Sequence, residues 1–292
     1  MKAPAAIQLA IALLAPATGA GAQSTINPAD KYAYGANTGW LNSRPSAADG
    51  VVVGEAFLTG YIYAANFGWI HLGDGTPANG HTYANASAAD FGVNHDGTGT
   101  LAGYGYSGNI GWVNFGWAAA NDPNRPHFDL LTGQFSGYAY SANTGWINLA
   151  GHLATDTLAS PDTDGDGMAD AWEIRKFRNL SIAGIGTDRD KDGQSDAAEY
   201  VADTNPNDAA ESLRIISQSY HAGTTQVTLV FATTRPTRTY RIETGTTLLT
   251  GEVVGWVTSG TAFLADPGTT TRTISFAGGP RRFFRVVAQK PL

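Results

Sequence analysis

Residues 137–149 read GYAYSANTGWINL, and the same pattern recurs at residues 60–72 and 103–115, with a partial copy at residues 32–42. The two tyrosines of each copy alternate with other residues, which is the period of two expected of a strand. An Asn and, two residues later, a Gly then fall where a turn is needed, and the Trp begins a return strand. Each copy is therefore predicted to be a β-hairpin. Because an isolated hairpin cannot bury its apolar face, the copies are expected to combine into a closed ring or a stacked array.

Insertions of variable length separate the copies. Their tryptophans are spaced by 29, 43 and 34 residues and are Trp40, Trp69, Trp112 and Trp146. Such spacing is typical of a repeat whose hairpin is constant and whose connections vary. Additional strands are expected near residues 51–53, 91–94 and 127–130, and these would make three-stranded units.

The repeated aromatics have two interpretations. A Trp at one fixed position of each copy is what a repeated hydrophobic core requires, and core packing is the interpretation that we favour. Stacking of the rings on sugars is the alternative. Phe67 and Trp117, which lie outside the repeated positions, are the aromatics expected to be more exposed.

Two acidic stretches farther along the chain are nearly alike, DTDGDGMADAWE at residues 162–173 and DRDKDGQSDAAE at residues 188–199. Both place Asp at positions 1, 3, 5 and 9, Gly at 6 and Glu at 12, which is the ligand spacing of a calcium-binding loop. The predicted ligands of the first ion are Asp162, Asp164, Asp166, the carbonyl of Met168, Asp170 through a water, and bidentate Glu173. Those of the second ion, in the same roles, are Asp188, Asp190, Asp192, Gln194, Asp196 and Glu199. A solvated acidic linker is the alternative, but two complete matches favour two calcium ions.

No helix is expected before either loop, because Pro161 precedes the first and two glycines, Gly184 and Gly186, precede the second. A short helix can follow each loop, over residues 169–177 and 195–202. Helices this short have too little core to form alone. Calcium is therefore expected to supply the folding energy of the segment and to turn it into a stiff joint.

Composition divides the chain into four parts. Residues 1–22 fit a secretory signal peptide, with a basic residue, an apolar run and small residues before the cleavage point, so secretion or cell-surface localisation is expected. Residues 23–161 are the predicted aromatic, Gly-rich β-repeat domain, and residues 162–212 are the paired calcium-loop segment with two short helices. Residues 213–292 are predicted to form a small β-sandwich of about seven strands. The expected fold class is mostly β.

Charge and composition exclude several classes of function. The chain has no cysteine, which excludes disulfides and thiol chemistry, and its formal net charge of −7 gives no indication of a nucleic-acid partner. No transmembrane segment is expected. The arginines of the last part are expected on solvent faces, with a polyanion-binding patch as the alternative; those considered are Arg238, Arg241, Arg282 and Arg285.

No catalytic motif is evident. Glu55 is the only glutamate of residues 23–161, and the six histidines are scattered along the chain. Residues 103–108 spell GxGxxG, but they belong to a strand-turn-strand repeat rather than to a dinucleotide-binding turn. A site assembled from distant residues stays open, and a polysaccharide-active enzyme is the third possibility for the function.

The run from Pro161 to Ala209 resembles the thrombospondin type 3-like calcium repeats of exported bacterial proteins, whose dockerin-like loops lack an incoming helix. In that family the pair commonly joins a variable front domain to a small β-domain that ends in an aromatic-Arg-Val strand, and residues 283–287, FFRVV, match that ending. The hairpin copies are similar to Trp-containing repeats of bacterial surface proteins. The resemblance implies export and a calcium-dependent architecture more than any reaction.

We therefore expect an exported calcium-binding structural, cell-surface or matrix protein, whose two ions stiffen the joint between two β domains. The alternative is a glycan-binding adhesin or lectin that uses the aromatic repeat domain. Extracellular polysaccharide or cell-surface components are the partners that this alternative indicates.

Overall fold

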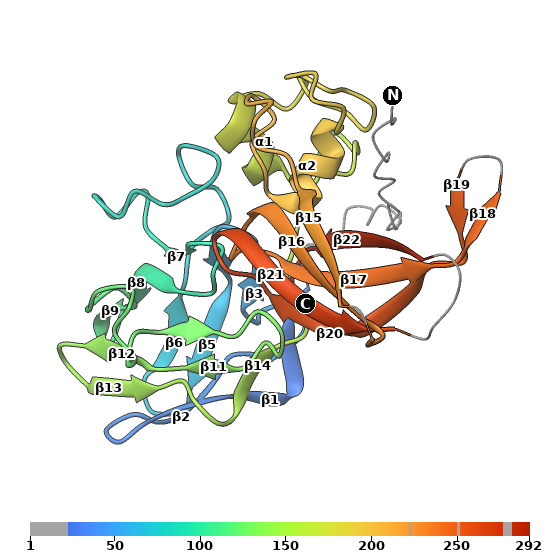
Figure 1. Ribbon diagram of the computed structural model, residues 1–292. Coiled ribbons are helices and arrows are strands. Elements are labelled where there is room, and N and C mark those ends of the chain that lie inside the picture. Colours follow the sequence, from blue (N-terminus) through green and yellow to red (C-terminus); the bar gives the residue numbers. More distant parts are fainter. Residues whose placement is uncertain (1–22, 222, 250–251, 277–281) are drawn as a thin grey trace. The chain divides into compact units, whose positions relative to one another are not determined.

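The computed structural model describes residues 23–221, 223–249, 252–276 and 282–292 (Figure 1). It is mostly β, with 44% strand and 6% helix, which confirms the predicted class. The chain divides into a first unit that ends at Ile182 and a second unit that runs from Ala183 to Pro291. The predicted signal peptide lies outside the described residues. Neither of the helices that the structure describes has the length or the apolar character needed to cross a membrane.

Four hairpins of the first unit form a closed antiparallel sheet (Figure 1). The hairpins are β1 (Ile26–Gly35) with β2 (Gly39–Asn42), β5 (Tyr61–Ala64) with β6 (Gly68–His71), β8 (Leu101–Ser107) with β9 (Gly111–Asn114), and β12 (Tyr138–Ser141) with β13 (Gly145–Asn148). Neighbouring hairpins pair in chain order, and β13 pairs back with β1. Of the two expected arrangements, the closed ring is therefore the one observed.

The interior of the ring is filled by the residues between the aromatics. In each hairpin a pair of buried residues faces inward, and the pairs are Ala33 with Leu41, Ile62 with Ile70, Gly105 with Val113, and Ala139 with Ile147. Three of the four pairs combine a small residue with a larger one. The interior of a closed sheet of eight strands is just wide enough to be filled by side chains, often with small residues opposite large ones.

The interpretation of the repeated aromatics as core residues is wrong. All twelve lie on the outer face and are 36–55% exposed: Tyr32, Tyr34, Trp40, Tyr61, Tyr63, Trp69, Tyr104, Tyr106, Trp112, Tyr138, Tyr140 and Trp146. Phe67, expected to be more exposed, packs against the core, and Trp117 is only partly exposed. Strand alternation places the aromatics on one face but does not say which face is buried. The buried cluster takes the aliphatic residues of the opposite face instead, such as Leu41, Ile70 and Ile147.

A circle of side-chain hydrogen bonds joins the four turns. In the four hairpin turns the residues with positive φ angles, of 72–87°, are the glycines Gly39, Gly68, Gly111 and Gly145. The turn asparagines instead donate their amides, at 2.8–3.1 Å, to a carbonyl of a neighbouring turn: Asn66 to Thr38, Asn109 to Phe67, Asn143 to Ile110, and Asn37 to Thr144. Each turn is thereby fastened to the next around the ring.

The expected additional strands are present, but two of them pair differently from the prediction. The remaining strands of the unit are β3 (Val52–Val53), β4 (Leu58–Thr59), β7 (Val93–His95), β10 (His127–Phe128), β11 (Phe135–Ser136) and β14 (Leu153–Thr155). Strand β7 pairs with β8 as predicted, whereas β3 pairs with β4 and β10 with β11. The insertions therefore form small sheets of their own beside the ring, and β14 extends it by pairing with β1.

The second unit contains two three-stranded antiparallel sheets, with the orders β15-β16-β21 and β20-β17-β22. Its strands are β15 (Arg214–His221), β16 (Gln226–Thr234), β17 (Thr239–Gly245), β18 (Thr247–Leu249), β19 (Glu252–Val254), β20 (Val257–Leu264), β21 (Gly268–Ser275) and β22 (Phe283–Gln289). Phe231 of one sheet and Tyr240 of the other lie in the same buried cluster. The packing fits the predicted β-sandwich.

The prediction of solvent faces is wrong for two of the arginines. Arg238 is 5% exposed and donates to the carbonyls of Tyr200 and Val201. Arg285, whose side chain is 13% exposed, forms an ion pair with Glu243, which Arg241 also contacts, both at 2.6 Å. These arginines are therefore internal partners, and they do not form a free polyanion-binding patch.

Candidate metal centre

Each acidic loop leads directly into a short helix, as predicted. The first loop precedes α1 (Asp170–Phe177), and the second precedes α2 (Asp196–Ala202). Within the described residues no helix leads directly into either loop, since residues 178–187 separate α1 from the second loop. Position 9 of each loop is thus the first residue of its helix, and Glu173 and Glu199 lie within the first turn.

Backbone hydrogen bonds hold the carboxylates of the first loop. Asp162 accepts from the amides of Gly165 and Gly167, at 2.7 and 2.9 Å. Oδ1 of Asp166 accepts from the amide of Met168 at 2.9 Å, and Oδ1 of Asp170 accepts from that of Thr163 at 2.8 Å. The loop is therefore folded around the same side chains that are predicted to bind the ion.

The second loop repeats these bonds at the same positions. Asp188 accepts from the amides of Lys191 and Gly193, at 2.8 and 3.1 Å. Asp192 accepts from Gln194, and Asp196 accepts from Arg189. Two sequences that differ at the intervening positions thus give one local geometry.

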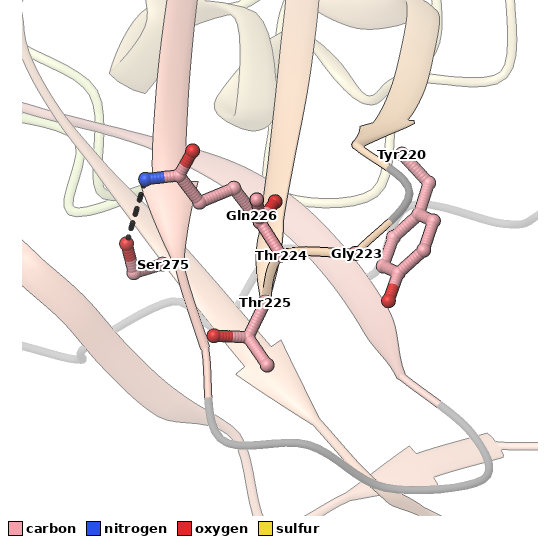
Figure 2. A pocket seen from close by; sticks show the side chains of 6 residues that line it. All are labelled: Tyr220, Gly223, Thr224, Thr225, Gln226 and Ser275. Atoms are coloured by element: carbon pink, nitrogen blue, oxygen red, sulfur yellow. Dashed lines mark hydrogen bonds between the residues drawn. The ribbon is translucent and has the colours of Figure 1, made fainter.

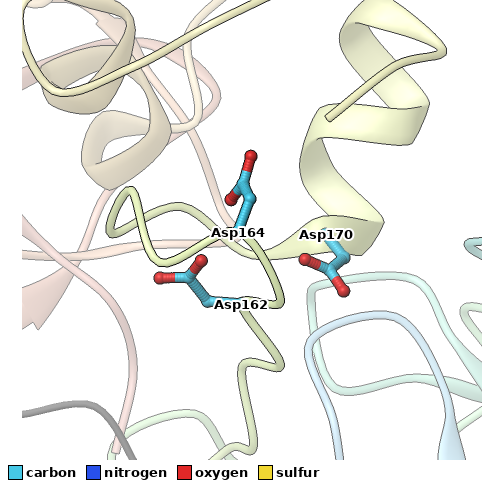
Figure 3. A group of neighbouring side chains, drawn as sticks. All are labelled: Asp162, Asp164 and Asp170. Atoms are coloured by element: carbon cyan, nitrogen blue, oxygen red, sulfur yellow. The ribbon is translucent and has the colours of Figure 1, made fainter. Parts of the chain in front are cut away.

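The carboxylates converge in both loops. Ligand atoms lie within 4.8 Å of one another in three groups: Asp162 with Asp164 and Asp170, Asp164 with Asp166 and Glu173, and Asp188 with Asp190 and Asp192. Figure 3 shows the first group, with Asp170 at the start of α1 beside the two aspartates of the loop. The sets from the first loop share Asp164, so they describe one site.

Several oxygens in these groups are buried without a hydrogen-bond donor. Within the described residues they are Oδ2 of Asp166, both carboxylate oxygens of Glu173, Oδ2 of Asp190, Oδ2 of Asp192 and Oε2 of Glu199. Glu173 and Glu199 are both 0% exposed. Burying a carboxylate oxygen without a partner costs folding free energy, so the arrangement favours binding of a cation.

The electrostatics of the loops point the same way. Burial, together with the charges of Asp166 and Asp164, raises the pKa of Glu173 to about 8. The pKa of Glu199 is also raised to about 8, chiefly by burial. The hydrogen bond from Thr204 lowers this pKa, and the charges of Asp190 and Asp192 raise it. Each loop thus brings together more carboxylate groups than the nearby hydrogen-bond donors satisfy.

The donor set fits calcium. Calcium takes six to eight oxygen ligands, commonly carboxylates and backbone carbonyls, in a flexible geometry. The side chain of Met168 is buried, and the side-chain amide of Gln194 donates to the carbonyl of Leu213 at 3.3 Å. The Met168 side chain has no oxygen, so position 7 of the first loop can offer only its backbone carbonyl; the same role for Gln194 stays a prediction. The residues present fit one calcium ion in each loop.

Each helix packs on its own unit. In the first unit, Ile174 of α1 lies so close to Gly80 that a Cβ on that glycine would be 3.0 Å from its Cγ2. In the second unit, Arg238 holds the last carbonyls of α2, and Lys290 contacts the hydroxyl of Tyr200 at 3.0 Å. The division of the chain at Ile182 separates the two loops accordingly.

Sequence reasoning missed the residues that support the second loop. Thr204 donates to Glu199 at 3.0 Å, and Arg238 holds the end of α2 from a strand of the sandwich. Thr204 lies five residues after Glu199 in the chain, and its hydroxyl could have been recognised as a possible donor to that carboxylate. Arg238 carries no such signal, because only the tertiary fold brings it to the helix.

No family model, no curated protein and no solved structure matches this chain. The resemblance of the loops to thrombospondin type 3-like repeats therefore rests on their residues alone.

Proposed function

We propose that the protein is an exported calcium-binding structural protein of the cell surface or matrix, and that each loop binds one calcium ion. The observation that carries this is the pair Glu173 and Glu199, each wholly buried at position 12 with at least one oxygen that no donor of the described residues reaches. Two positive charges at each site would offset the gathered carboxylates.

Calcium would act on both ends of the connection between the two β units. Each helix is too short to form alone and begins inside its loop, so the ion and the helix should fold together. Residues 178–187, between the end of α1 and the start of the second loop, are the part of the connection that belongs to neither calcium loop nor helix. The ions would thereby stiffen the joint from both sides.

Export is part of the proposal and rests on residues 1–22 and on the resemblance of the loops. Extracellular calcium sites commonly bind with Kd values of about 10⁻⁴ to 10⁻³ M, which suits sites that are filled after secretion. Mass spectrometry of the extracellular protein should find an N-terminus at Gln23. An intracellular protein that retains residues 1–22 would refute this part.

Calorimetric titration with calcium tests the metal sites. We expect two binding events in the protein without its signal segment, one in Glu173→Gln or Glu199→Gln, and none in the double variant. Glutamine has nearly the same shape but removes the bidentate carboxylate, and a lost ligand of this kind should weaken its site at least about tenfold. Asp49→Asn, at an exposed acid of the first unit, is the control and should bind two ions. No binding at millimolar calcium would refute the proposal.

A further inference from the structure

The outward aromatics form rows that cross from one hairpin to the next. Asn148 of β13 pairs with Tyr138 inside its own hairpin and with Tyr34 of β1 across the closure of the ring. Tyr34 in turn pairs with Trp40. Tyr138, Asn148, Tyr34 and Trp40 therefore lie in line on the outer face, and we name this line the seam row.

Three equivalent rows complete the ring. They are Tyr32, Asn42, Tyr63 and Trp69; Tyr61, His71, Tyr106 and Trp112; and Tyr104, Asn114, Tyr140 and Trp146. Each has two tyrosines, one tryptophan and, between the tyrosines, an asparagine or a histidine. At about 4.8 Å between neighbouring strands, a row across four strands spans roughly 14 Å.

The seam row is the most accessible of the four at its tryptophan. Trp40 is 55% exposed, against 42% for Trp112, which the ring of Phe91 contacts at 5.1 Å between centroids. In another row, Trp117 contacts Trp146 in the same way at 4.7 Å. Aromatic rings of the insertions thus cover part of two other rows. Trp40 is contacted edge-on by the ring of His152 at 5.8 Å and still has the largest exposed fraction of the four tryptophans.

A hollow of about 290 Å³ lies along the seam row, and it is lined by Tyr32, Tyr34, Trp40, Asn148 and His152 among others. Pockets for small ligands begin at about 300 Å³. The second unit has a larger hollow, of about 630 Å³ (Figure 2). Its lining is mainly Thr224, Thr225, Gln226 and Ser275 with one ring, that of Tyr220, so it lacks a comparable aromatic wall.

The lining of the seam hollow suits an uncharged, hydroxylated ring. No Asp, Glu, Lys or Arg lines it. Aromatic rings offer apolar faces on which the C–H face of a sugar can stack, and an amide offers hydrogen bonds to hydroxyl groups. Oδ1 of Asn148 accepts from the amide of Ala150 at 2.9 Å, which orients the side chain and leaves its NH₂ group to donate.

The charge of the surrounding domain disfavours anionic ligands. Residues 23–161 carry three Lys and Arg residues against nine Asp and Glu residues. A surface with this excess of negative charge repels polyanions and anionic lipid surfaces. We propose that the seam row binds a chain of neutral pyranose sugars. Its length accommodates a short stretch of such a chain rather than a single ring.

Stabilisation of the sheet alone does not account for the seam row. Cross-strand aromatic pairs strengthen any sheet, and all four hairpins have the same Tyr-Trp pair. That role predicts four similar rows, whereas the open tryptophan and the aromatic hollow occur together at the seam. Their coincidence at one place favours a ligand.

The test uses the protein without its signal segment, in calcium, with soluble cello-, xylo- and chito-oligosaccharides and with alginate as the anionic probe. Binding is followed by tryptophan fluorescence and calorimetry. We expect at least one neutral oligosaccharide to bind, and Trp40→Ala and Asn148→Ala to weaken it at least about tenfold, as is common for a central aromatic contact. Trp112→Ala is the matched control and should change the affinity less than about threefold.

Circular dichroism and thermal melts establish that the variants are folded, and Trp40→Phe, which keeps a ring, should bind more tightly than Trp40→Ala. Equal losses in Trp40→Ala and Trp112→Ala would overturn the assignment to the seam row. Binding of alginate alone, or of none of the probes, would overturn the ligand class. The seam row contains no residue of either acidic loop, so failure of calcium binding would leave this test intact.

Discussion

Replacing Glu199 by Gln should have opposite effects on stability with and without calcium. The carboxylate is 0% exposed, and Oε2 has no donor among the described residues. In a chelator, burial raises the pKa of Glu199 to about 8, so the folded wild type must either hold a proton there or bury a charge. Glu199→Gln removes that cost and keeps an oxygen that can accept from Thr204. Because an unsatisfied buried polar group costs about 1–3 kcal/mol, and a charged one more, we expect the metal-free variant to gain about 2 kcal/mol.

In calcium the order should reverse. An ion that binds only the folded state stabilises it by about 2.7 kcal/mol at 100 times its Kd. The wild type gains this at the second loop, and Glu199→Gln does not. Urea unfolding in calcium and in chelator, for the wild type, Glu199→Gln and Asp49→Asn, measures both differences. A loss of stability in chelator as large as that in calcium would refute the reasoning, since it would mean that the carboxylate has a structural partner and no need of an ion.

Three further predictions concern the two units. Arg238→Ala should destabilise the second unit by about 3 kcal/mol in urea unfolding, because it removes one buried and one part-buried hydrogen bond to carbonyls at the end of α2; an unchanged midpoint would contradict this. Asn109→Ala should cost about 1 kcal/mol, the value of one hydrogen bond, since it opens the circle of turns, and hydrogen exchange at those turns should show whether it does. Burial raises the pKa of Glu243, but hydrogen bonds from its two arginine partners outweigh burial and hold it below the usual 4.5. The stability that ionised Glu243 contributes is complete above pH 4.5 and is lost as the pH falls through the lower pKa of the folded state. The melting temperature of Glu243→Gln should therefore depend less on acid pH than that of the wild type. Parallel curves of melting temperature against pH would contradict the assignment.

Local sequence was sufficient for the hairpins, the loops and the helices. Carboxylates at positions 1, 3, 5, 9 and 12 of the first loop and at positions 1, 3 and 5 of the second lie close together, as their spacing predicts, and each helix begins at position 9 of its loop. The turn glycines were equally readable, because a positive φ is a property of one residue. The calcium ligands themselves stay a prediction until an ion is measured.

The contacts that join distant residues were not readable in this way. Asn66 bonds to Thr38 of the preceding turn, and Arg238 bonds to carbonyls of a helix 37 and 38 residues earlier in the chain. No spacing rule links such positions, because the folded sheets alone bring them together. The aromatic rows are of the same kind, since each takes its residues from two hairpins and the seam row exists only where the last hairpin meets the first.

The amino-acid sequence by itself determined which residues of a hairpin share a face and which residues of a loop share a centre, because both follow from the local geometry of the backbone. Tertiary structure alone decided that Tyr and Trp face outward, that the four hairpins close into a ring, and that the two loops belong to different units. The physical reason is that an alternating strand has two faces, and the one that is buried depends on the space that the other strands leave inside.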